Sequence, residues 1–136
     1  MDVLVLIGRI LFAVLFLNSA YAHFSQTRNM AGYAASKGVP QAYAATVGGG
    51  ILLALGSVSV LLGIWADLGS LLLAAFLIPT ALMMHAFWKE TGQGRMTESV
   101  QFFKDMGLAG AALALAGLFS IAGDALDFTI TGPLFK

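Results

Sequence analysis

The residues with the greatest chemical capacity in this sequence are its two histidines, His23 and His85. They lie near the carboxyl ends of the first and third of four long apolar segments. An imidazole can carry a proton near neutral pH, ligate haem iron or bond a quinone carbonyl. The two side chains therefore either share one site or make independent hydrogen bonds at the surface. Independent bonds are favoured, because no acidic residue or cysteine is expected beside the pair.

Three further polar residues lie within the first apolar segment and complete the candidate ligand-binding set. Arg9 either extends its guanidinium to the polar surface or is buried beside an acidic partner, and a structural role is favoured over substrate binding. The acidic residues expected on its side of the molecule are Asp67, Asp124 and Asp127. Asn18 and Tyr21 share one helix face, and Asn18 is predicted to hydrogen-bond a neighbouring helix.

Composition excludes several other kinds of site. The chain has no cysteine, which excludes disulfides, thiolate metal sites and iron–sulfur clusters. Seven basic and seven acidic residues balance, and no basic stripe is available for nucleic acid. The sequence shows no nucleophile–base–orienter pattern and predicts no metal site, so we expect no self-contained catalytic constellation, although the chain could be a subunit of a quinone-linked oxidoreductase. A redox role would need a bound quinone, a flavin or the cofactor of a partner protein.

Four apolar segments must position these residues, at about residues 3–24, 43–65, 68–88 and 102–123. Apolar residues make up 59% of the chain and charged residues 10%, too few charges to solvate a surface of this size. Each segment has about the 20 residues that cross roughly 30 Å of hydrocarbon as a helix. The sequence therefore predicts an all-α membrane protein, a four-transmembrane-helix bundle forming one domain over residues 1–136.

The connections between the segments predict a short helix and an orientation. Residues 30–37, capped by Asn29, are expected to form an interfacial helix between spans one and two, and Thr97 is expected to cap the helix of span four. The basic residues of connections one and three are Arg28, Lys37, Lys89, Arg95 and Lys104. Only Arg9 and Lys136 lie near the other side, so the positive-inside rule predicts that both termini are outside.

Small residues predict how the helices pack. Gly49, Gly56 and Gly63 recur at intervals of seven and share one face of span two. Gly107, Gly110 and Gly117 form a similar small-residue face on span four. Because lipid tails are as apolar as leucine, helices in a bilayer associate through close packing at such faces. Both faces are expected to point into the bundle or into a subunit contact, and the latter would make the protein a homo-oligomer.

Several short motifs, in order along the chain, resemble the DoxX family of membrane proteins. They are residues 8–12 (GRILF), 30–40 (MAGYAASKGVP) and 49–56 (GGILLALG), His85, and residues 123–127 (GDALD). Two positions depart from the family pattern. Thr46 and Val47 occupy the stretch where the family usually has a glutamate, and residues 20–23 (AYAH) replace its Gly-x-x-Lys-like ending of span one.

The resemblance implies a four-helix membrane fold and a link to membrane redox systems, which include the small subunits of thiosulfate:quinone oxidoreductase and oxidative-stress complexes. The first hypothesis is therefore an accessory subunit of a quinone-linked or oxidative-stress assembly in a prokaryotic plasma membrane, with a membrane or soluble redox partner. The alternative is a non-catalytic protein that binds lipid or another hydrophobic ligand, or that acts as a scaffold. A transporter is least favoured, because one short bundle lacks paired broken helices.

Overall fold

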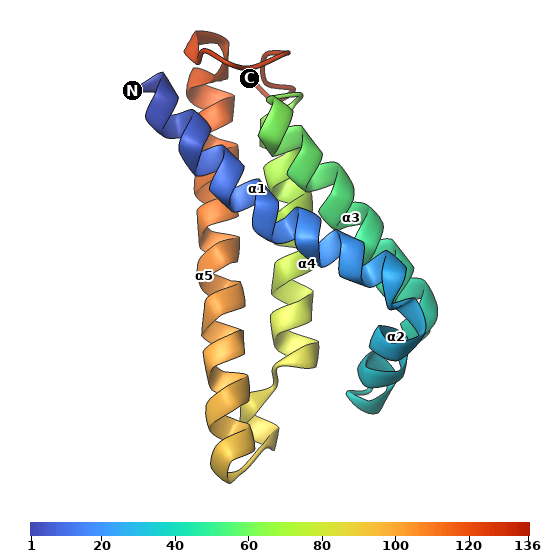
Figure 1. Cartoon of the computed structure of the whole chain (residues 1–136). Helices are drawn as coiled ribbons and strands as arrows, with labels where there is room; N and C mark the ends of the chain where they lie inside the picture. The colour runs from blue at the N-terminus through green and yellow to red at the C-terminus, as the bar shows by residue number, and fades with distance from the viewer.

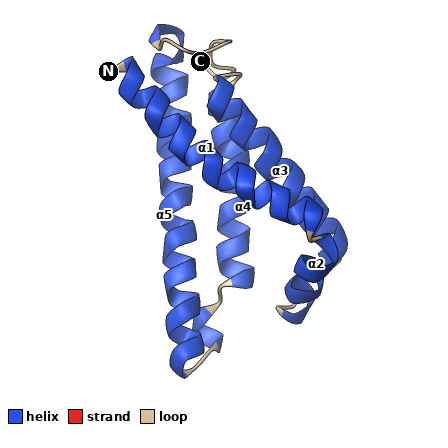
Figure 2. Ribbon diagram, viewed as in Figure 1, coloured by secondary structure: helices blue, strands red, loops and turns tan.

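A computed structural model describes residues 1–136, and all of its regular structure is helical (Figure 2). The elements are α1 (Asp2–Ser25), α2 (Thr27–Ser36), α3 (Ala42–Leu62), α4 (Ala66–Met84), the short 3-10 helix η1 (Phe87–Lys89), α5 (Gly92–Ala122) and the 3-10 helix η2 (Gly123–Ala125). Four helices are long and apolar enough to cross a membrane. The predicted all-α fold with four spans and a short helix between spans one and two is confirmed.

The four long helices pack in an open chain of neighbours. α3 contacts both α1 and α4, and α4 in turn lies along α5. α1 crosses the front of the bundle diagonally, and both chain termini lie at the end opposite α2 and the α4–α5 connection (Figure 1).

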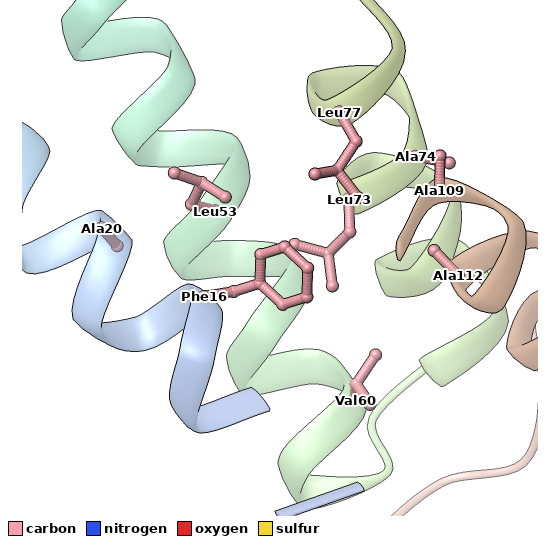
Figure 3. Close-up of a cluster of buried hydrophobic side chains, with 9 residues drawn as sticks. All are labelled: Phe16, Ala20, Leu53, Val60, Leu73, Ala74, Leu77, Ala109 and Ala112. Atoms are coloured by element: carbon pink, nitrogen blue, oxygen red, sulfur yellow. The ribbon is translucent and has the colours of Figure 1, made fainter. Parts of the chain in front are cut away.

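The core of the bundle is built where the four helices meet. Phe16 of α1 reaches between α3 and α4, close to the fully buried Leu53 and Leu73 (Figure 3). Alanines supply the α5 side of this cluster, at Ala109 and Ala112. A small side chain at each α5 position lets that helix approach α4 closely, which is how helices gain packing energy in lipid.

Glycines on α3 are in close contact with α4. A Cβ on Gly56 would lie 2.7 Å from Cγ of Leu73 and 2.8 Å from the carbonyl oxygen of Gly69. A Cβ on Gly49 would lie 2.9 Å from the ring of Phe76. At Gly56 the backbone of α4 leaves no room for a Cβ, whereas at Gly49 a Cβ would require the Phe76 ring to shift.

The α5 glycines behave differently. A Cβ on Gly107, Gly110 or Gly117 would meet nothing within 4 Å, and all three are exposed. They do not pack within the bundle of one chain, because alanines rather than glycines face α4. This face therefore does not point into the bundle of one chain, and its role in a subunit contact stays a prediction.

Two helices begin earlier than the sequence predicted. α2 begins at Thr27, so Asn29 lies inside the helix and the prediction that it is the cap is wrong. The Thr27 hydroxyl donates to the His23 carbonyl oxygen at 2.7 Å, which satisfies the end of α1 and permits a break of one residue. α5 begins at Gly92, five residues before the predicted cap Thr97. At 1.5 Å per residue its 31 residues extend about 46 Å, beyond the hydrocarbon of a bilayer.

The chain after α5 folds back across the ends of α3 and α4. The Ile130 and Thr131 amides donate to the Gly63 carbonyl oxygen at 3.1 and 3.0 Å. The buried carboxylate of Asp67 accepts hydrogen bonds from the Leu134 and Phe135 amides at 3.0 and 2.7 Å. This tail therefore closes the end of the bundle that holds both termini.

Candidate functional site

Arg9 belongs to the closed end of the bundle rather than to a ligand site. Its side chain is 1% exposed, and its three nitrogens donate to the carbonyl oxygens of Val60, Leu61 and Phe128, each at 2.9 Å. The last carbonyls of a helix have no helical donor and carry the negative end of its dipole, so a buried cation is favoured there. Arg9 therefore clamps the end of α3 to the C-terminal tail.

The two environments predicted for Arg9 are both absent. No acidic side chain pairs with it, since Asp67 binds the tail amides and Asp124 pairs with Lys136 at 3.0 Å. Its burial also excludes extension to a lipid headgroup. Gly63, predicted as a packing glycine, makes room for this clamp: it has φ +66° at the end of α3, and a Cβ there would lie 2.8 Å from Nη2 of Arg9.

Asn18 and Tyr21 face away from the interior. Asn18 is exposed and Tyr21 is 72% exposed on the outer face of α1. The hydrogen bond predicted from Asn18 to a neighbouring helix is therefore not formed within this chain. Neither residue shares a cavity with the histidines.

His23 is held in one orientation at the end of α1. Its Nδ1 lies 2.8 Å from the Ser19 carbonyl oxygen, and because a carbonyl only accepts, Nδ1 carries the hydrogen. The ring meets Phe76 edge-on, with centroids 5.6 Å apart. A Cβ on Gly50 would lie 3.0 Å from Cβ of His23, so the lack of a side chain at this α3 position leaves room for the histidine. His23 is thus a buried imidazole that is oriented through Nδ1, and its Nε2 takes no part in that hydrogen bond.

His85 lies between two carboxylates of α5. Its Nδ1 is 2.6 Å from Oε2 of Glu98, and its Nε2 is 3.6 Å from Oδ2 of Asp105. Glu98 and Asp105 are seven residues apart and therefore share one face of the helix. The expectation that no acidic residue lies beside the histidines is wrong, because α5 extends far enough past the α4–α5 connection to place both carboxylates there.

A lysine and a tyrosine of the first connection reach the same carboxylates. Nζ of Lys37 lies 3.5 Å from Glu90 and from Glu98, and the Tyr33 hydroxyl donates to Glu98 at 3.4 Å. Burial lowers the pKa of Lys37, but the nearby Tyr33, Glu98 and Glu90 outweigh it and raise that pKa above the ordinary 10.5. The charged lysine thus ties the end of α2 to the beginning of α5.

The two histidines line one cavity, which we call the histidine cavity. Its volume is about 290 Å³, and it lies between the α1–α2 side and the α4–α5 side of the molecule. Its lining includes His23, His85, Asp105, Tyr33, Phe16 and Phe76. Of the five predicted ligand-binding residues, the structure brings together the two histidines and excludes the other three.

Sequence reasoning missed the acidic partners of this cavity. By hydropathy alone, Glu98 falls in the connection before span four, and Asp105 falls in the first turn of that span, predicted over residues 102–123. Their spacing of seven was the available signal, but it becomes meaningful only if the helix begins before Glu98. No group of three or more histidine, cysteine or acidic residues is arranged to hold a metal ion. The arrangement is that of an imidazole with two carboxylates, which can hold and pass a proton.

Comparisons with known proteins identify relatives of the whole bundle. The DoxX family model matches residues 4–86, which is more than half of the chain and includes both histidines. The inner membrane protein YphA of Escherichia coli (strain K12) is 26% identical over 114 residues, covering 84% of this chain and 81% of that protein. No solved structure matches. The two carboxylates lie on α5, beyond the residues that the family model matches.

Proposed function

Because this chain belongs to the DoxX family and is an integral membrane protein, we propose that it binds a quinone-like amphiphile in the histidine cavity. In this proposal the protein is an accessory subunit of a membrane redox assembly, and a partner protein exchanges electrons with the ligand. The observation that carries the proposal is the placement of His85 between Glu98 and Asp105 at the edge of a largely apolar cavity.

The lining residues fit a ligand of this class. A quinone needs hydrogen-bonding groups for its carbonyl oxygens and apolar walls for its ring, and binding cavities combine these features. Here His85 and Tyr33 are polar, whereas Phe16, Leu77 and Leu108 are apolar. The cavity volume of about 290 Å³ is at the lower end of the range of roughly 300–1,000 Å³ that small-molecule sites occupy. It accommodates a headgroup rather than a whole long-chain molecule.

The chain's own residues provide a proton relay for such a ligand. Glu98, on Nδ1, fixes the orientation of the His85 ring and therefore aims Nε2 at Asp105. A proton can reside on Nε2 or on the Asp105 carboxylate, so this pair can deliver a proton to a carbonyl oxygen in the cavity or accept one from it. A bound quinone would supply the electron chemistry. Lys37 and Tyr33 hold Glu98 in place from the opposite side.

The position of the relay is consistent with proton supply from one side of the membrane. Connections one and three carry five basic residues, against two near the other side, and by the positive-inside rule this bias favours an orientation with these connections in the cytoplasm and both termini outside. We propose a prokaryotic plasma membrane as the location. The name of YphA as an inner membrane protein supports it.

Ligand extraction tests the proposal directly. The full chain is purified in mild detergent, and bound small molecules are extracted and identified by mass spectrometry. We expect a prenyl quinone with the wild type and its loss with His85→Gln, because a glutamine amide lacks the ring that Glu98 and Asp105 hold at the edge of the cavity. Tyr21→Phe is the matched control, because Tyr21 is outside the cavity. Unchanged redox turnover in native membranes carrying His85→Gln would show that His85 takes no part in the chemistry.

The second candidate function is a non-catalytic protein that binds lipid or another hydrophobic molecule. The apolar residues that line the cavity, eight of 14 when the ring of Tyr33 is counted with them, favour it. Extraction of phospholipid alone, retained equally by the wild type and His85→Gln, would support this candidate over the first.

A further inference from the structure

A second cavity lies beside the histidine cavity, between α2, α3 and α4. We call it the glycine cavity, because Gly48 and Gly49 form part of its α3 wall. Its volume is about 370 Å³, and its other walls include Leu52 and Pro79. Eight of its 13 lining residues are hydrophobic, and it contains no charged side chain. It is therefore a space for hydrocarbon rather than for a polar group.

The two cavities share one wall. Phe76, Thr80 and Met84 line both of them, and these residues follow one another at intervals of four along α4. From the α1 side, the ring of His23 meets the same Phe76 edge-on at 5.6 Å. A single layer of side chains thus separates a cavity with a polar edge from an apolar one.

The glycine cavity exists because side chains are missing from its α3 wall. A Cβ on Gly48 would meet nothing within 4 Å, so the space beside this residue is open. Gly49, in contrast, is in close contact with Phe76, since a Cβ there would lie 2.9 Å from the Phe76 ring. The first glycine leaves space, and the second lets the shared wall lie against α3.

We propose that the glycine cavity holds the hydrocarbon chain of the ligand whose headgroup occupies the histidine cavity. This inference rests on the proposed function, and it specifies the ligand as an amphiphile with a long, flexible apolar chain, such as a prenyl quinone. The chain passes the Phe76 side chain and lies against Gly48, Leu52 and Pro79. The evidence for this occupant is that the two cavities are adjacent, since Phe76, Thr80 and Met84 line both of them.

The physics of the bilayer explains why such a chain needs its own cavity. Transfer of a hydrocarbon chain from lipid into a protein gains no hydrophobic energy, because the lipid is equally apolar. The chain is retained only by close packing against complementary walls. Filling the cavity with a protein side chain should therefore remove the preference for long-chain ligands and leave headgroup binding intact.

The test compares two substitutions at glycines whose Cβ position is unobstructed. Both glycines are exposed, but Gly48→Leu adds a side chain at the wall of the glycine cavity, whereas Gly110→Leu adds the same side chain to a face of α5 that lines neither cavity. Binding of a long-chain and a short-chain ubiquinone analogue is measured with the full chain in lipid nanodiscs. We expect Gly48→Leu to weaken long-chain binding by at least about tenfold and to change short-chain binding by less than about twofold. Gly110→Leu should alter neither.

A crosslinking measurement on the wild type removes any dependence on folding of the variant. A long-chain quinone with a photoreactive group at the end of its chain should label residues of α3 and α4 around Gly48 and Pro79. Labelling confined to exposed faces, or equal long-chain binding by Gly48→Leu and wild type, would overturn the inference. If His85→Gln still abolishes binding of the headgroup in that case, the proposed function stands. If the wild type binds neither analogue, both fail together.

Discussion

Replacement of Arg9 by methionine is the most direct test of how this bundle is held together. The substitution keeps a long, flexible side chain but removes the guanidinium, which donates to the carbonyl oxygens of Val60, Leu61 and Phe128 at 2.9 Å each. These oxygens lie at the end of α3 and in the tail, where no helical amide can replace the lost donors. Arg9→Met should therefore weaken the end of α3 and release the tail at the same time.

The size of the effect follows from two limits. Side-chain hydrogen bonds within membrane proteins are worth on average about 0.6 kcal/mol each, so three such bonds set a lower limit near 2 kcal/mol. Leaving buried partners of a charged group unpaired costs up to about 5 kcal/mol. We expect a loss of about 3 kcal/mol in the free energy of unfolding, between these limits. Arg9→Lys should lose less, because an ammonium keeps the charge but cannot reproduce the planar fork of the guanidinium.

Unfolding equilibria in mixed detergent micelles provide the measurement. Arg28→Met is the matched control, since Arg28 is exposed on α2, and its effect should stay within about 0.5 kcal/mol. Limited carboxypeptidase digestion should shorten the tail faster in Arg9→Met than in the control. Equal stability and equal digestion of the two variants would show that the carbonyl clamp does not stabilise the fold.

Four further outcomes are expected at other positions. Asp67→Ala should cost about 2 kcal/mol and expose the tail to protease, because two backbone amides lose their acceptor. Gly56→Ala should destabilise the protein by about 1–3 kcal/mol, because the added Cβ would clash with α4. Gly107→Ala should be neutral or stabilising by up to about 1 kcal/mol, because its Cβ would meet nothing. Thermal unfolding in detergent compares the stabilities of the two variants. Glu98→Gln should increase hydrogen exchange in α2 without affecting the long helices, because the link to Lys37 is weakened. Because folding raises the pKa of Lys37, the stability that this lysine contributes is fully present below pH 10.5 and is lost only as the pH rises through the higher pKa of the folded state. The hydrogen-exchange rate of α2, corrected for intrinsic exchange, should therefore stay constant from neutral pH to 10.5.

The carboxylates of α5 change how the histidines are understood. In the sequence the pair lacked an acidic neighbour, and the departure from the family pattern at Thr46 removed the acidic residue expected on span two. In the structure Thr46 is buried on α3, with its hydroxyl donating to the Ala42 carbonyl oxygen at 2.8 Å. The acidic groups come from α5 instead, through Glu98 and Asp105. An acid–imidazole site is thus built in this chain without a carboxylate from span two.

The end of the bundle opposite this site is held by hydrogen bonds that the sequence does not indicate. The backbone amides of the tail after α5 bind Asp67 and the last carbonyls of α3. Arg9 and Asp67 are both buried, and both are bonded to backbone groups rather than to each other. Their charges are therefore balanced by dipoles of the main chain, not by an ion pair.

The sequence by itself determined the class of fold and the main elements. Four continuous apolar runs, each long enough to cross a bilayer, can satisfy their backbone only as helices, so hydropathy alone defines them. Gly49 and Gly56 were also recognisable as close-packing positions, because regular spacing on one helix is a local property. The absence of cysteine excluded thiolate chemistry without any coordinates.

Only the tertiary structure decided which polar groups meet. Arg9 binds backbone carbonyls more than 50 residues away, and carbonyls are present at every residue, so no pattern of residue types could select them. His85 meets Glu98 and Asp105 because α5 begins at Gly92 and turns back along α4, and polar residues 92–101 gave no apolar period from which that start could be predicted. Hydropathy is a sum over neighbouring residues, whereas these contacts depend on the distance between segments that the folded bundle alone brings together.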